Sequence, residues 1–207
     1  MKRYKGIIGI GLVVIGLIFG VNHYQNQSAG DMILRFIGLP AWSYDDSSGL
    51  HYSVIGAFIM TITGFLLTAS HYSKITHIKL KLILFGALFA VLYPFATEQA
   101  MFIVKRNTTG LEAVEYIKNK STCEYETMDD QLNMDCSIKV NNYGKNAERI
   151  YVYPNSNNDR SEFKPEKLSL PPHSQNVYNI SFTTSMDEDG SLFGETDIPD
   201  IQINVLQ

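Results

Sequence analysis

The sequence predicts a membrane protein with three transmembrane helices followed by a C-terminal all-β sandwich. Three observations support this prediction. Long apolar runs fill the first half of the chain, charged residues become dense from Lys105 onward, and apolar residues of the second half alternate with polar ones. Uninterrupted apolar runs of this length are typical of membrane helices, whereas alternation is typical of half-buried β-strands. The boundary between the two halves is therefore predicted at Lys105.

The membrane region is predicted over residues 1–104, with spans at about residues 5–22, 54–71 and 82–103. Each span approaches the ~20 residues that cross ~30 Å of hydrocarbon, and the first two are near the lower limit. Ionisable residues are missing from the middle of every span. This disfavours a proton- or ion-coupled transporter, which usually carries such groups at membrane depth.

Basic residues near the span ends predict the orientation, because Lys and Arg are retained on the cytoplasmic side. Three lie within residues 2–5 and three within residues 74–81, whereas the long first connection, residues 22–53, has only Arg35. We expect a multi-pass protein of the cell membrane with a cytoplasmic N-terminus and an extracytoplasmic C-terminal domain. The alternative for the first span is a signal peptide cleaved after Ala29, which would leave the domain outside as well.

The second half is acidic, with 10 Lys and Arg residues against 17 Asp and Glu residues and a net charge of −7. This charge argues against nucleic acid as a partner. The expected partners are the lipid bilayer and a membrane or extracytoplasmic protein. Residues 105–120 are predicted as a short connecting helix, because Thr109 and Glu112 have the spacing of a capping box.

Residues 121–207 form the predicted β-sandwich domain. Six segments have period-two alternation, with turn residues between them. They are residues 123–127, 132–141, 147–153, 167–170, 176–184 and 200–206. The apolar positions of the last five are predicted to face the core: Met134, Cys136, Ile138, Val140, Ile150, Val152, Leu168, Leu170, Tyr178, Ile180, Phe182, Ile201, Ile203 and Val205.

Two stretches of this domain resemble the immunoglobulin-like modules of many bacterial surface proteins. They are Ile138-Lys-Val-Asn-Asn-Tyr-Gly and Leu168-Ser-Leu-Pro-Pro. The resemblance is one of architecture over residues 120–207, and it implies an immunoglobulin-like sandwich without implying any chemistry.

Both cysteines, Cys123 and Cys136, lie in the predicted outside domain. Pairing the first two strands about residues 128–131 places Thr127 opposite Leu132 and Cys123 opposite Cys136. We therefore predict a cross-strand disulfide, which suits an oxidising compartment. The alternative is a pair of free buried thiols.

Gly16 and Gly20 form a small-xxx-small pair in the first span. Glycines let two helix backbones approach closely, so this pair predicts helix packing. The partner helix is either another span of the same chain, which we favour, or a second membrane protein.

His23, His51 and Glu98 are predicted at the same outer level by the topology. Histidine and carboxylate side chains suit zinc, and with Asp45 or Asp46 they suit acid–base chemistry at the lipid surface. Against this, polar residues are required at the end of any span, and the histidines lack a tight ligand spacing. We therefore predict no metal, no cofactor and no assigned catalytic residue.

The segment from Asp31 to Trp42 is too short to cross the bilayer. It is predicted either to lie along the membrane interface, anchored by Trp42, or to form a loop packed on the outside domain. The acidic stretch at residues 187–191 fails the spacing of a calcium-binding EF-hand and is predicted as a solvated hairpin loop.

The function predicted from these features is a membrane-anchored module whose outside domain binds or senses a protein or an envelope component. Enzymatic activity is less favoured. The alternatives are a membrane-interface enzyme that uses His23, His51 and Glu98, and a small transporter-subunit or immunity-type protein.

Overall fold

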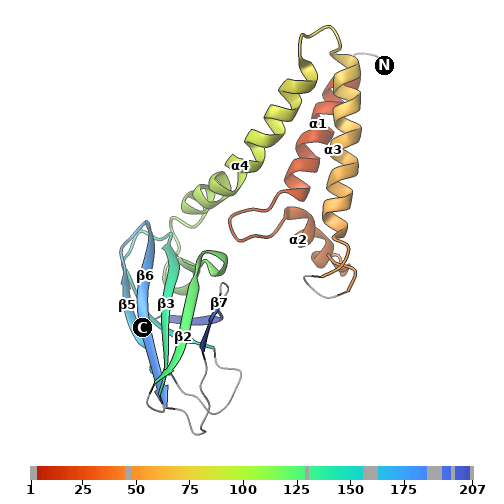
Figure 1. Cartoon of the computed structure of the whole chain (residues 1–207). Helices are drawn as coiled ribbons and strands as arrows, with labels where there is room; N and C mark the ends of the chain where they lie inside the picture. Colours follow the sequence, from red (N-terminus) through yellow and green to blue (C-terminus); the bar gives the residue numbers. More distant parts are fainter. Residues whose placement is uncertain are drawn as a thin grey trace. The chain divides into compact units, whose positions relative to one another are not determined.

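The computed structural model describes residues 4–44, 48–128, 131–155, 163–185, 193–196 and 199–205. The chain divides into two compact units, Met1–Glu98 and Gln99–Gln207. The first unit is helical, and the second consists of antiparallel sheets (Figure 1). The boundary lies within six residues of the predicted one, in the last turns of a long helix rather than after it.

Within the described ranges, the helical part of the chain contains four α-helices. They are α1 (Tyr4–Gly20), α2 (Ala29–Phe36), α3 (Tyr52–His71) and α4 (Ile78–Val104). Among the described residues, α3 and α4 are long and apolar enough to cross a membrane, whereas α1 is an apolar helix of 17 residues. None of the apolar 18-residue window of α4 is buried inside the described structure. A helix that is apolar all round and exposed needs an apolar solvent around it.

Helices α1 and α3 run side by side in close contact (Figure 1). Small residues line the contact because a larger side chain has no room there. A Cβ atom built on Gly16 would meet the carbonyl oxygen of Ala57 at 3.0 Å, and one built on Gly9 would meet that of Gly64 at the same distance. The two backbones therefore touch along a seam of small residues, which includes Gly20 opposite Ala57.

The described residues of the second unit form eight strands, all antiparallel to their partners. The strands are β1 (Val114–Tyr116), β2 (Thr122–Met128), β3 (Gln131–Asn142), β4 (Glu148–Pro154), β5 (Glu166–Leu170), β6 (Ser174–Ser185), β7 (Phe193–Thr196) and β8 (Ile201–Val205). In the larger sheet, β6 pairs with one edge of β3, while β2 and β1 pair with its other edge and β7 pairs with β2. The smaller sheet has the order β5-β4-β8.

The two sheets share one apolar core. Ile138 and Val140 from β3 and Ile150 and Val152 from β4 are fully buried. Burial of each such side chain contributes about 1.5–3 kcal/mol relative to exposure. The core contains every inward-facing position predicted from the alternation except Val205, whose side chain lies outside the described residues. The six predicted strands are confirmed with shifts of one or two residues at their ends.

The connecting helix predicted over residues 105–120 is wrong. Two short 3-10 helices, η1 (Gly110–Glu112) and η2 (Lys118–Lys120), flank strand β1 instead. Thr109 makes no side-chain cap, and Gly110 adopts a positive φ of 67°, which lies outside the right-handed α-helical region. The backbone after η1 instead forms hydrogen bonds with the end of β3 that lies beyond its pairing with β2. Val114 of β1 pairs there with Asn142.

Strand β1 brings Tyr116 against the chain just before β8. The Tyr116 hydroxyl donates a hydrogen bond to the carbonyl oxygen of Pro199 at 2.8 Å. Burial raises the pKa of Tyr116 from 10.0 to about 12, because the phenolate loses water, and the negative charge of Asp200 acts in the same direction. The phenol is therefore neutral over the physiological range.

Candidate functional site

His51 is the predicted site residue around which other polar side chains gather. Its Nε2 lies 2.6 Å from Oδ1 of Asp31, and the Ser53 hydroxyl donates to the same carboxylate oxygen at 2.5 Å. The other face of the His51 ring stacks on Trp42, with ring centroids 3.9 Å apart. Asp31 belongs to α2, whereas His51 and Ser53 lie at the start of α3.

The Asp31 carboxylate also takes part in the capping box at the start of α2. Ser28 is the N-cap residue, and its hydroxyl accepts the Asp31 backbone N–H at 3.0 Å, while the Ser28 N–H donates back to the carboxylate. Burial favours the neutral carboxyl, but hydrogen bonds from Ser53, His51 and Ser28 outweigh that effect. The pKa of Asp31 is therefore lowered, and the carboxylate is ionised at neutral pH.

This cluster, made of Ser28, Asp31, His51 and Ser53, acts as a clasp between α2 and α3. A catalytic triad would place histidine between the hydroxyl and the carboxylate, so that the histidine takes the hydroxyl proton. Here the carboxylate lies between them, and Ser53 donates to Asp31. The arrangement holds two helices together and does not activate a nucleophile.

The other two residues predicted to lie near His51, His23 and Glu98, are not part of this cluster. His23 lies in the loop after α1, where its Nδ1 accepts the backbone N–H of Gln25 at 3.0 Å. Glu98 is buried in α4. Within the described ranges, no three His, Cys, Asp or Glu side chains gather as metal ligands, so these two and His51 do not form a zinc centre. Asp45, Asp46 and the acidic stretch at 187–191 lie outside the described residues.

Sequence reasoning missed Asp31 and Ser53 as partners of His51. One signal was available, because Ser28 and Asp31 have the S-x-x-D spacing of a capping box. That spacing predicts the start of a helix. The pairing with His51, 20 residues away, arises only when α2 folds back on α3.

The predicted strand register is confirmed, with Thr127 opposite Leu132 and Cys123 opposite Cys136. The two cysteines lie at disulfide distance, with Cα atoms 4.1 Å apart, and both are buried. Gly16 and Gly20 lie on the face of α1 that packs on α3, which is the intrachain contact favoured above.

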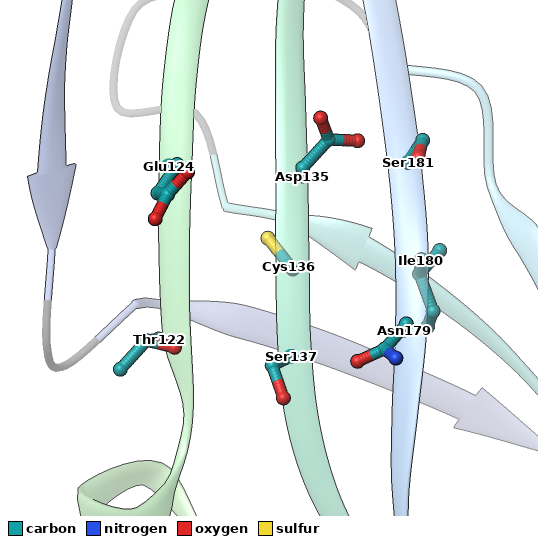
Figure 2. A pocket seen from close by; sticks show the side chains of 8 residues that line it. All are labelled: Thr122, Glu124, Asp135, Cys136, Ser137, Asn179, Ile180 and Ser181. Carbon is teal, nitrogen blue, oxygen red and sulfur yellow. The ribbon is translucent and has the colours of Figure 1, made fainter.

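A shallow depression of about 310 Å³ lies on the larger sheet, across β2, β3 and β6 (Figure 2). Polar side chains from adjacent strands form two rows across it. Glu124, Asp135 and Ser181 form one row, and Thr122, Ser137 and Asn179 form the other.

The first row places two carboxylates directly opposite each other, since Glu124 and Asp135 are register partners. Like charges in that position destabilise a sheet. Neither side chain takes part in an ion pair within the described part of the chain. The depression therefore presents an uncompensated negative charge and favours a cationic group.

Strand β6 lines one side of this depression, and its outer edge is unpaired within the part of the chain that the structure describes. Its 12 residues pair with β3 over their whole length, from Ser174 to Ser185. Among the described residues, no strand pairs with the opposite edge of β6. The strand contains no charged residue and no proline, and Val177 is 58% exposed on its outer face.

These features lie together on one side of the larger sheet. An open strand edge offers backbone donors and acceptors, and the adjacent depression offers carboxylates. Comparison with protein families, curated proteins and solved structures found no significant match to this chain.

Proposed function

We propose that this chain is a multi-pass membrane protein whose extracytoplasmic, immunoglobulin-like β-sandwich captures an extended, basic segment of a partner protein along the free edge of β6. Helices α1, α3 and α4 are the three spans in this proposal. The open edge of β6 is the observation that carries it.

The length and composition of the helices support a membrane location. α3 and α4 are long and apolar enough to cross a bilayer, and at 1.5 Å per residue the 17 residues of α1 extend about 25 Å. Lys74 lies between α3 and α4, and Lys79 and Lys81 lie in the first turn of α4. By the positive-inside rule this connection is cytoplasmic, which places the chain after α4 on the other side.

The edge of β6 favours capture of an extended chain. Natural proteins protect edge strands with lysines, prolines, bulges or covering loops, because an open edge recruits other strands. β6 has neither lysine nor proline over 12 residues. A peptide that adds as a further strand gains main-chain hydrogen bonds along this edge, and side-chain contacts on one face give specificity.

The depression indicates the charge of the captured segment. Side chains of an added strand extend over the same sheet face as Asn179 and Ser181, and β6 lies between them and Asp135 on β3. A long lysine or arginine side chain can reach across β6 toward Asp135, whose negative charge is reinforced by its register partner Glu124. The net charge of −7 from residue 105 onward also favours encounter with a basic partner.

A site-specific crosslinking experiment tests this proposal. A photo-crosslinking amino acid replaces Val177 in the full chain, and intact cell membranes are irradiated. We expect one discrete adduct with a partner protein. The matched control places the same amino acid at Tyr151, a partly exposed position on β4 of the other sheet, where we expect no adduct.

Two further variants separate edge pairing from nonspecific capture. The Glu124→Gln/Asp135→Asn double variant should weaken the adduct at position 177, because it removes the attraction for basic side chains. Truncation after Lys118 should abolish partner recovery. Equal adducts at positions 177 and 151, or full recovery by the truncated chain, would show that β6 is not the binding edge.

A further inference from the structure

Helix α2 has an apolar face that is exposed among the described residues. Phe36 is 91% exposed, and Met32 and Ile33 are about half exposed on the same side of the helix. Ile37 and Leu39 extend this face beyond the helix end. Contiguous apolar surface of this kind marks contact with a partner or a membrane.

The opposite face of α2 is fixed to the ends of two apolar helices. A Cβ atom on Gly30 would meet the Phe19 carbonyl of α1 and the Cβ of Ser53 in α3, so the backbones touch there. The clasp through Asp31 ties the same face to the first turn of α3. α2 is thus held where α1 ends and α3 begins (Figure 1).

One cation accompanies the apolar face. Arg35 lies in the last turn of α2 and is exposed, and it forms no ion pair within the described part of the chain. A helix with an apolar face and a basic residue beside it is typical of peptides that lie in the membrane interface. The lipid phosphate is the anion found at that depth.

We propose that α2 docks on the phospholipid surface, with Met32, Ile33 and Phe36 inserted at the boundary between headgroups and acyl chains and Arg35 at the phosphates. Insertion to about 5–10 Å is the depth typical of such helices. This inference rests on the membrane location proposed above. Docking of α2 adds a surface contact to the contacts made by the spans. It would place the clasp and Trp42 at the depth of the lipid headgroups.

The only tryptophan of the chain makes the proposal testable by fluorescence. In a Trp42→Phe background, Phe36→Trp moves the single indole onto the proposed docking face. The full chain is reconstituted in vesicles of phosphatidylcholine and phosphatidylglycerol that contain brominated lipids. We expect bromine near the headgroup end of the acyl chain to quench this tryptophan several-fold more than bromine near the chain terminus.

The matched control is Val177→Trp in the same background, because Val177 is also an exposed apolar residue but lies on the sheet. We expect no loss of its emission with either lipid. If Phe36→Trp is equally unquenched while alkaline carbonate leaves the chain in the membrane, α2 faces water or protein and the docking proposal is wrong. If carbonate extracts the chain, the proposed membrane location itself is wrong.

Discussion

Removal of the bond between Cys123 and Cys136 should destabilise the sheet domain by about 3 kcal/mol. The two residues are 13 apart in sequence, and on the chain-entropy model a loop of this length restricts the unfolded chain by that free energy. A urea m-value of roughly 1–3 kcal/mol per molar converts this loss into a decrease of about 1–3 M in the unfolding midpoint. That decrease is large enough to measure without extrapolation.

Pulse proteolysis of the full chain in detergent, detected through a C-terminal tag, gives the midpoint for the sheet domain. Three samples are needed: oxidised wild type, wild type reduced in urea and refolded, and the Cys123→Ala/Cys136→Ala variant. Reduction in urea is required because both sulfurs are buried in the folded domain. Reduced wild type keeps its sulfur atoms, so it isolates the crosslink from the loss of buried volume in the variant.

We expect the reduced wild type and the variant to unfold at similar, lower urea concentrations, and only wild type to respond to reductant. If the midpoint of wild type is unchanged by reduction, the crosslink does not contribute and the loop-closure argument is refuted. A midpoint lowered in the variant alone would assign the effect to packing of the sulfurs instead.

Two other perturbations test features of the fold. Gly16→Val should destabilise the α1–α3 pair by about 1–3 kcal/mol, because the valine side chain would press on the backbone of α3. The control is Gly11→Val, which should change the stability little because a Cβ atom at Gly11 has nothing within 4 Å. The detergent denaturation midpoint, followed by Trp42 fluorescence, measures both variants. Tyr116 should make the sheet domain sensitive to alkali: its folded-state pKa is raised, so its contribution is present below pH 10.0 and is lost as the pH rises through about 12. Alkaline unfolding of wild type compared with Tyr116→Phe checks this, and an identical loss of stability in both between those pH values would contradict it.

Much of the sheet domain follows from local sequence. Alternation in the segments around Cys123 and Cys136 defines both the inward face and the register, since a slip of one residue would move every apolar side chain to the wrong face. Strand β1 was missed because three residues cannot show a period. The spacing of Thr109 and Glu112 predicts the start of an α-helix, but Gly110 between them has a positive φ, which excludes an α-helix at that position.

The candidate site was only partly predictable. The position of His51 near a span end indicates a site residue, but the topology offers only carboxylates predicted at the same level as its partners. Asp31 carries no such signal, because its sequence pattern describes a helix start and not a contact with α3. The free edge of β6 is likewise a property of sheet order, which alternation in single strands does not reveal.

The seam between α1 and α3 constrains how this sequence can diverge. Exposed positions of α1, such as Ile7 and Ile15, should exchange among apolar residues at little cost to packing. Gly9, Gly16 and Gly64 admit almost no replacement, because each would press on backbone of the facing helix. In a deep mutational scan α1 and α3 should therefore retain a sparse pattern of small residues while their exposed apolar residues vary, and distant relatives should share that spacing more than their overall identity.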